Sequence, residues 1–211
     1  MEILGKLFGT PARVKIMRLF LLNQETPFDS DDIVERSRVT RSAFRKEINT
    51  LSSIGFVKKK RFVKEEVRAN GKVVKKKKDG WLFDATFPFV EPLKSLLVDP
   101  EFMVKDDLIT RLKRAGKVKL LIVSGIFLQE SDSRVDLLIV GENIRRPKME
   151  DIIRKVEAEI GKELSYAIFD TQEFLYRLNM YDKLIRDVLD FPHERLVEAK
   201  EFSTYLFTKK A

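Results

Sequence analysis

The stretch from Val39 to Asp84 constrains the fold of this chain more than any other part of its sequence. Its apolar spacing predicts a helix from Arg41 to Ser53, and the residues after it predict a long two-stranded ribbon. Asn70-Gly71 supplies the two positive φ angles of a type I′ turn and places the end of the ribbon there. Between residues 41 and 78 there are 14 Lys or Arg residues and three acids. A helix and a hairpin with this much positive charge suit the grooves and phosphates of duplex DNA.

The predicted turn also fixes how the two strands of the ribbon pair. With Asn70 and Gly71 as the central residues, the side chains near the turn form favourable cross-strand pairs, which supports this register. Because side chains alternate along a strand, the ribbon carries lysines on both faces. The expected pairs are Val67 with Val74, Glu66 with Lys75, and Glu65 with Lys76.

Composition narrows the class of protein. The 211 residues are 44% hydrophobic and 35% charged, with no cysteine and one histidine, so disulfides are excluded and a His-based metal site is not expected. No apolar run approaches the roughly 20 residues that span a bilayer, and the first residues lack the pattern of a secretory signal. We therefore expect a cytoplasmic protein with no membrane partner, no metal and no cofactor.

The charge is distributed unevenly between the two halves of the chain. Residues 1–100 carry 21 Lys or Arg and 13 Asp or Glu, whereas residues 101–211 carry 20 of each. The whole net charge of +8 therefore belongs to the first half. Asp99-Pro100 breaks the helix predicted before it, which extends to about Val98. We predict two domains, 1–99 and 100–211, of which only the first is suited to a polyanion.

Three helices are predicted in the first domain. Thr10 caps the first, with Pro11 at its first helical position, where no amide donor is needed. Ser30 is expected to cap a short helix that runs through Arg36. Thr40 caps the third. This order of helix, short helix, tight connection and helix is the helix-turn-helix arrangement.

The third helix has an apolar face and a polar face. Phe44, Ile48 and Leu51 fall within a narrow arc and are expected to face the core. The opposite face and its flank carry phosphate binders and base-edge readers, although an ordinary solvated helix face would also be polar. The candidate DNA-binding residues on this helix are Arg41, Ser42, Arg45, Lys46 and Asn49.

The basic ribbon decides between those two readings. A basic tract by itself can be a solubilising surface, but a basic hairpin directly after a helix-turn-helix is more specific. This pattern resembles the winged helix-turn-helix family, with the ribbon as its wing, and the resemblance implies double-stranded DNA as the partner. The candidate DNA-binding residues on the ribbon are Lys58, Lys60, Lys72, Lys75, Lys76, Lys77 and Lys78. The apolar groups Phe87–Phe89 and Leu93–Leu97 either close the first core or form the seam of a homodimer.

The second half alternates helices and strands, which predicts a small mixed sheet covered by helices. The strands from Val118 and from Val135 are continuously apolar apart from Lys119 and Asp136 and are expected to be buried. The predicted strands are Val118–Val123, Val135–Val140 and Leu164–Phe169, and the predicted helices are Asp106–Arg114, Pro147–Gly161, Thr171–Asn179 and Tyr181–Leu189.

Residues of roughly 110–197 resemble the minimal nucleotidyltransferase fold of the polymerase-β type. That family has Gly-Ser after its first strand, two acids on one face of the second strand and a further acid on a later one, which together bind two metal ions. Here the first pair is reversed as Ser124-Gly125, Arg134 replaces the first acid, and only Asp136 matches. The strand Leu164–Phe169 has no carboxylate. We therefore expect no catalysis and no metal at these vestigial positions.

Two roles follow for the acid and the arginine. Asp136 is expected to be a satisfied polar residue at a strand edge. Arg134 either pairs with Asp136 or binds an anion. The fold class predicted for the whole chain is α+β, with an N-terminal winged helix-turn-helix domain followed by a small α/β nucleotidyltransferase-like domain with a mixed sheet.

Sequence-specific duplex-DNA binding, as in a transcription regulator, is the expected function. The second domain would then serve dimerisation, sensing of a small molecule or binding of a protein effector. Two alternatives stay open. One is an active metal-dependent nucleotidyltransferase acting on RNA, protein or a small molecule, and the other is an antitoxin-like protein-binding module.

Overall fold

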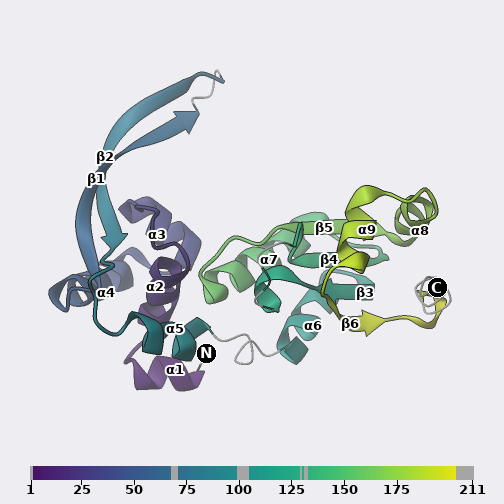
Figure 1. Cartoon of the computed structure of the whole chain (residues 1–211), viewed down its shortest axis with the longest axis horizontal. Coiled ribbons are helices and arrows are strands. Elements are labelled where there is room, and N and C mark those ends of the chain that lie inside the picture. Colours follow the sequence, from purple (N-terminus) through teal and green to yellow (C-terminus); the bar gives the residue numbers. More distant parts are fainter. Residues whose placement is uncertain (1, 68–70, 99–104, 129, 131–132, 203–211) are drawn as a thin grey trace. The chain divides into compact units, whose positions relative to one another are not determined.

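The computed structural model describes residues 2–67, 71–98, 105–128, 130 and 133–202, and its class is α+β (Figure 1). Contacts divide the chain into two compact units, one of Met1–Asp99 with Lys155–Lys162 and one of Pro100–Arg154 with Glu163–Ala211. The division into domains at 1–99 and 100–211 stays a prediction, because these contacts count the end of one helix of the second half with the first unit.

The helices of the first unit begin where the sequence places them, with one exception and one addition. Thr10 and Thr40 cap two of them as predicted, because each hydroxyl accepts the hydrogen bond of the amide three residues later. The helix at the N-terminus was not predicted. The helices are α1 (Glu2–Leu7), α2 (Pro11–Leu22), α3 (Ser30–Ser37), α4 (Arg41–Ser53) and, after the ribbon, α5 (Val90–Val98).

The cap of α3 is Asp29 and not Ser30, so this prediction was wrong. The Asp29 carboxylate accepts the amide hydrogen bond of Asp32 at 2.9 Å, and the Asp32 side chain in turn accepts from the amide of Asp29. This reciprocal capping box satisfies two amides, whereas a single serine hydroxyl would satisfy one. Ser30 is therefore the first residue inside the helix.

The core of the first unit gathers around phenylalanines. Phe44, Ile48 and Leu51 are buried as predicted and hold α4 against it. Of the apolar groups near α5, Leu97 is fully buried and closes this core, whereas Phe89 is 61% exposed. The alternative of a dimer seam stays open for the exposed part of that group. The largest buried side chains of this core are Phe20, Phe28, Phe56 and Phe83.

The ribbon consists of β1 (Val57–Val67) and β2 (Val73–Phe83), which pair antiparallel and curve away from the helices in Figure 1. The predicted register was wrong by one residue. Five residues, 68–72, separate the paired ends, so a two-residue turn does not join these strands. Asn70 of the predicted turn lies outside the described residues, and Gly71 has a φ of 76°. The observed pairs are Val67 with Val73, Glu66 with Val74, and Glu65 with Lys75.

The second unit is built on a four-stranded sheet, which is mixed as predicted. Its order is β5-β4-β3-β6, with β4 and β5 parallel and the other neighbours antiparallel. The last strand was not predicted. The strands are β3 (Lys117–Val123), β4 (Leu137–Glu142), β5 (Tyr166–Asp170) and β6 (Glu194–Glu198). The helices are α6 (Lys105–Lys113), α7 (Arg146–Ile160), α8 (Thr171–Asn179) and α9 (Lys183–Asp190).

The two central strands carry the core of this sheet. Leu120 to Val123 of β3 and Leu137 to Val140 of β4 are fully buried, which confirms the prediction from their unbroken apolar runs. Phe174 of α8 and Ile185 of α9 pack with them in one apolar cluster. In the part of the chain that the structure describes, no helix combines the length and the apolar character needed to cross a membrane.

Candidate nucleic-acid interface

The outer face of α4 is polar, basic and exposed. Burial of its opposite face fixes the rotation of the helix, so the predicted surface residues point away from the core. Ser42 and Thr40 lie with their hydroxyls 3.1 Å apart at the start of the helix. All five candidate residues of this helix are exposed, namely Arg41, Ser42, Arg45, Lys46 and Asn49.

A buried acid holds α4 in this rotation. Glu47 is 1% exposed, and its carboxylate accepts a hydrogen bond from Arg13 Nε at 2.7 Å and one from Thr10 Oγ1 at 3.0 Å. Both partners lie at the start of α2, so the contact ties the two helices together. Sequence reasoning missed this residue. Its only signal is that Glu47 precedes Ile48 on the inward arc of the predicted helix, where an acid needs a partner.

The first residue of α4 has an acidic neighbour on α3. Arg41 pairs with Asp31 at 2.8 Å, and the two side chains are 66% and 62% exposed. Such an exposed pair is weak and exchanges readily with other partners. The start of α3, however, carries Asp29, Asp31 and Asp32 together. This end of α3 therefore presents negative charge.

The observed register sorts the ribbon side chains onto two faces. Even-numbered residues of β1 lie opposite even-numbered residues of β2, and odd opposite odd, so each face has one parity. The even-numbered face has Lys58 and Lys60 at its base, and its outer part, named the paired face here, contains Phe62, Lys64, Glu66, Val74, Lys76 and Lys78. The other, named the open face, contains Lys59, Arg61, Val63, Glu65, Val67, Val73, Lys75, Lys77 and Asp79.

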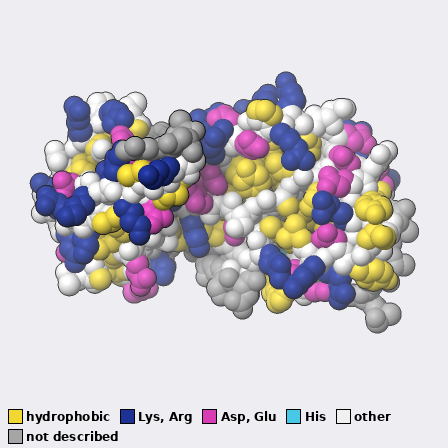
Figure 2. Space-filling view, turned by 90° about the horizontal axis from the view of Figure 1, so that it is seen from above, with side chains coloured by type: hydrophobic (Ala, Val, Ile, Leu, Met, Phe, Trp, Pro, Cys, Tyr) yellow, Lys and Arg dark blue, Asp and Glu magenta, His cyan; other side chains and the backbone are white. Residues whose placement is uncertain are grey.

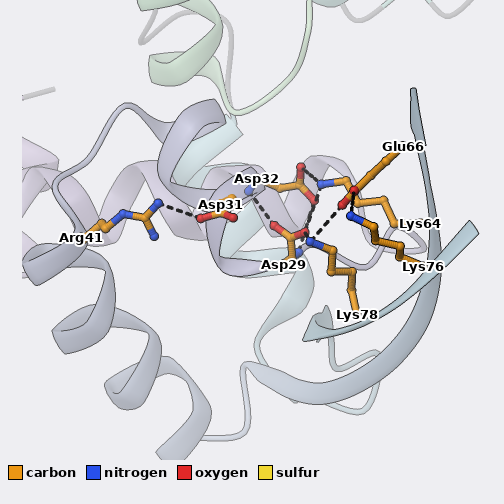
Figure 3. Close-up of polar contacts among 8 residues, drawn as sticks. All are labelled: Asp29, Asp31, Asp32, Arg41, Lys64, Glu66, Lys76 and Lys78. Carbon is orange, nitrogen blue, oxygen red and sulfur yellow. Dashed lines mark hydrogen bonds and ion pairs between the residues drawn. The ribbon is translucent and has the colours of Figure 1, made fainter. Parts of the chain in front are cut away.

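On the paired face, Lys64 lies between the two carboxylates of the α3 capping box. Its Nζ is 3.1 Å from Asp29 Oδ2 and 2.6 Å from Asp32 Oδ1, and its side chain is 29% exposed. Burial alone would raise the pKa of Asp29, but the Asp32 amide and the Lys64 ammonium together hold it below its usual range. The same contacts raise the pKa of Lys64 against the opposing effect of burial. This pair of contacts joins β1 to the start of α3 (Figure 3).

Glu66 extends the same network towards the tip of the ribbon. Its two oxygens accept from Lys76 at 2.6 Å and from Lys78 at 3.0 Å, and Lys78 also approaches Asp29 to 4.0 Å. Figure 3 shows Lys64, Glu66, Lys76 and Lys78 converging on the acids of α3. Three lysines and three carboxylates, all described residues, thus share one network on the paired face.

Low pH is expected to break the ion pairs of Glu66 with Lys76 and Lys78, which form the outer part of this network. Hydrogen bonds from Lys76 and Lys78 lower the pKa of Glu66 from its ordinary 4.5 to about 2. Because the folded pKa is the lower one, the stabilisation is complete above the unfolded value and is lost as the pH falls from 4.5 towards 2. An NMR titration of the Glu66 carboxyl carbon should have its midpoint at about 2. In a Lys76→Gln, Lys78→Gln variant the midpoint should rise towards 4.5, and a wild-type midpoint already there would contradict these ion pairs.

The open face is exposed and combines cations with apolar side chains. Its acids form ion pairs in which every side chain is more than half exposed, Arg61 with Asp79 at 2.8 Å and Lys75 with Glu65 at 3.4 Å. Figure 2, which looks down on the molecule, shows Lys and Arg side chains over much of the visible surface of the first unit. The valines of this face are Val63, Val67 and Val73, which are 57%, 73% and 52% exposed.

The remaining candidate lysines lie at the two ends of the ribbon. Lys58, at the base, pairs with Asp84 at 3.3 Å. Hydrogen bonds from the amide and hydroxyl of Thr86 lower the pKa of Asp84, and Lys58 adds to this effect. Lys60 and Lys72 are exposed. The structure therefore brings Lys58 and Lys60 near the end of α4, whereas Lys72 lies just before the outer end of β2.

The positions of the second unit that were compared with a nucleotidyltransferase site hold two loops together. Asp136 accepts hydrogen bonds from the amides of Ile126 and Ser165, both at 2.9 Å, as expected for a satisfied residue at a strand edge. The buried hydroxyl of Ser124 donates to the carbonyl of Val135. Gly125 has a φ of 56°, and a Cβ there would overlap the Asp136 carboxylate. These contacts hold the loop after β3 against the start of β4.

Arg134 does not pair with Asp136, so that alternative was wrong. Its Nε contacts Asp187 of α9 instead, because the Asp136 carboxylate is turned towards backbone amides. The pair leaves Arg134 half-exposed at the edge of the sheet. Among the described residues, no three His, Cys, Asp or Glu side chains lie close enough together to hold a metal ion.

Neither a protein-family model nor a curated protein matches this chain. The resemblances to the winged helix-turn-helix and nucleotidyltransferase families therefore rest on the residues quoted for them. What the first unit brings together is an exposed basic helix face and a long basic ribbon that follows it directly. In the second unit, the backbone amides of Ile126 and Ser165 meet at the carboxylate of Asp136.

Proposed function

We propose that the first unit binds duplex DNA as a winged helix-turn-helix, and that the chain is a sequence-specific transcription regulator. In this proposal α4 enters the major groove, which has the width of a helix, and the ribbon contacts the adjacent backbone. The observation that carries the proposal is the outer face of α4. It presents five exposed side chains of the types that bind phosphates and read base edges.

The identity of those side chains supports a reading role. An arginine can contact guanine O6 and N7 with two hydrogen bonds, and an asparagine can do the same with adenine N6 and N7. Arg45 and Asn49 are one helical turn apart on α4, and both are exposed. Lys46 lies beside them and suits a phosphate. An ordinary solvated helix would not need the basic ribbon that begins only a few residues after α4 ends.

For the second unit we propose a nucleotidyltransferase-like domain without catalysis, which serves dimerisation, effector sensing or partner binding. Its support is the use of Asp136, whose two oxygens are both occupied by backbone amides. A metal ion would have to displace these bonds and would also meet the positive charge of Arg134 nearby. Metal-dependent nucleotide incorporation would favour the first alternative, an active enzyme, and a pulldown that retains one protein without DNA would favour the second.

The proposal is tested by sequencing the genomic fragments that the purified protein retains and then measuring affinity for the best site and for random duplex. Arg45→Ala or Asn49→Ala should lower the preference for that site by roughly 1–3 kcal/mol if the side chain reads a base. Lys94→Ala is the control, because it removes an exposed cation on α5 of the same unit. An equal loss on both duplexes would make the residue a phosphate contact, and no retained duplex would contradict DNA binding.

A further inference from the structure

We infer that beyond Lys60 the ribbon contacts DNA through its open face only, and that Lys64, Lys76 and Lys78 of the paired face are positioning residues. This inference rests on the proposed DNA binding and refines it. The sequence assigned Lys75 to Lys78 to DNA as one tract. Alternation along β2 puts Lys75 and Lys77 on one face and Lys76 and Lys78 on the other, and the observed register puts Lys64 and Glu66 with the second pair.

Charge balance is the first reason. On the paired face the three ammonium groups are matched by the carboxylates of Asp29, Asp32 and Glu66 at 2.6 to 3.1 Å. A phosphate that approached this face would meet those carboxylates as well as the lysines. Linked pairs that share partners hold their geometry better than isolated surface pairs do. Phosphate binding here would therefore require breaking several contacts for each lysine gained.

The acids at the start of α3 also disfavour phosphate binding on the paired face. Asp31 is 62% exposed and lies in the first turn of α3, next to the two acids that bind Lys64. The start of a helix would otherwise be a good place for a phosphate, because its amides point outward. Here the capping box fills those amides with carboxylates. The side of the ribbon that faces α3 is thus unsuited to a DNA backbone.

The open face has the opposite properties. Lys59, Arg61, Lys75 and Lys77 outnumber its two acids, Glu65 and Asp79, and both acids are more than half exposed. Exposed pairs of this kind contribute little and are readily exchanged for phosphate. Val67 and Val73 face each other at the far end and are 73% and 52% exposed, so binding against this face would also remove apolar surface from water.

The base of the ribbon links the open face to α4. Trp81 has the parity of the open face, and its ring packs edge-on against Phe44 of α4 with the centroids 5.5 Å apart. Lys64 and Lys78, of the other parity, reach α3. The open face therefore begins on the side of the ribbon that meets α4. The network on the paired face holds the ribbon to α3 and keeps the open face available to the same duplex.

Two double variants of β2 separate the faces, because they remove the same charge from alternate positions of one strand. One is Lys75→Gln with Lys77→Gln, and the other is Lys76→Gln with Lys78→Gln. Fluorescence anisotropy with a short labelled duplex gives the dependence of log affinity on log salt for each. Since each phosphate contact contributes about 0.9 to this slope, the open-face variant should lose about 2 from it. The paired-face variant should keep the wild-type slope.

A positioning role can be measured in the free protein by amide hydrogen exchange. The paired-face variant should show faster amide hydrogen exchange in β1 and β2 without any DNA, whereas the open-face variant should exchange as the wild type does. Equal losses of slope in the two variants, or a larger loss in the paired-face variant, would overturn the one-faced contact. Unchanged exchange in the paired-face variant would overturn the positioning role. A wild-type protein that binds no duplex at low salt would overturn the proposed function and, with it, this inference.

Discussion

Arg13→Ala is expected to lower the free energy of unfolding by about 3 kcal/mol. The Arg13 guanidinium lies 2.7 Å from the carboxylate of Glu47, which is 1% exposed. Removing it leaves a buried carboxylate that keeps, among the described side chains, the hydrogen bond from the Thr10 hydroxyl. Arg13 itself is 25% exposed, so water can partly replace it, and the loss should fall at the lower end of the range for broken buried pairs. Chemical denaturation monitored by circular dichroism measures it.

The matched control replaces both partners. An Arg13→Met, Glu47→Leu double variant should recover most of the stability lost in Arg13→Ala, because a buried ion pair and a well-packed apolar pair are often of similar stability. If Arg13→Ala cost less than about 1 kcal/mol, Glu47 would not depend on this partner. A functional consequence is also expected. Since Glu47 fixes the rotation of α4, Arg13→Ala should weaken binding to the best duplex site more than binding to random duplex.

The elements that the sequence predicted well are those specified by local chemistry. Thr10 and Thr40 cap helices because each hydroxyl meets an amide three residues on, which depends on nothing farther along the chain. The start of α3 was misplaced by one residue because Asp29 and Ser30 are both good caps, and only the reciprocal bond from Asp32 decides between them. The short edge strand β6 was missed because its five residues do not alternate between apolar and polar, and none of them is buried.

The ribbon register shows why pairing arguments can mislead. Two adjacent glutamates, Glu65 and Glu66, face four consecutive lysines, so favourable ion pairs form in either of two registers. The valine pair at the end is equally ambiguous, because Val67 can meet Val73 or Val74. The Asn70-Gly71 signal then favoured the wrong register. The one-residue difference places Lys64 and Glu66, rather than Glu65, on the same face as Lys76 and Lys78.

The candidate site was predictable in its helix and not in its ribbon. The apolar arc of α4 was enough to predict correctly that Arg45, Lys46 and Asn49 are exposed. The contacts of Lys64 with Asp29 and Asp32 join residues 35 and 32 positions apart, and nothing local indicates which ribbon face meets α3. For the same reason sequence patterns could not show that Arg134 contacts Asp187 rather than Asp136.

Asp136→Ala is expected to lower the free energy of unfolding of the second unit by about 2–4 kcal/mol, and not to remove an activity. The two carboxylate oxygens each accept one amide hydrogen bond at 2.9 Å, from Ile126 after β3 and from Ser165 before β5. Hydrogen bonds to a charged group contribute about 1.5–3 kcal/mol each, and the half-exposed position of Asp136 reduces that value. Arg134→Ala is the control, because its pair with Asp187 is half-exposed and should cost less than about 1 kcal/mol.

The same variant separates a structural carboxylate from a catalytic one. A two-metal nucleotidyltransferase would need Asp136 free to bind a metal, so its replacement would abolish nucleotide incorporation with little loss of stability. We expect the wild-type protein to incorporate no labelled nucleotide with Mg²⁺ or Mn²⁺ and ATP, and we expect Arg134→Asp to restore none. The acid of the third strand, Asp170 at the end of β5, was placed beyond the predicted strand, and its carboxylate accepts the amide hydrogen bond of Glu173 at the start of α8. Incorporation by the wild type that is lost in a stably folded Asp136→Ala variant would contradict this expectation. Asp136 would then have to exchange its amide partners for a metal ion during turnover, and the first unit would hold a polyanionic substrate rather than a regulatory site.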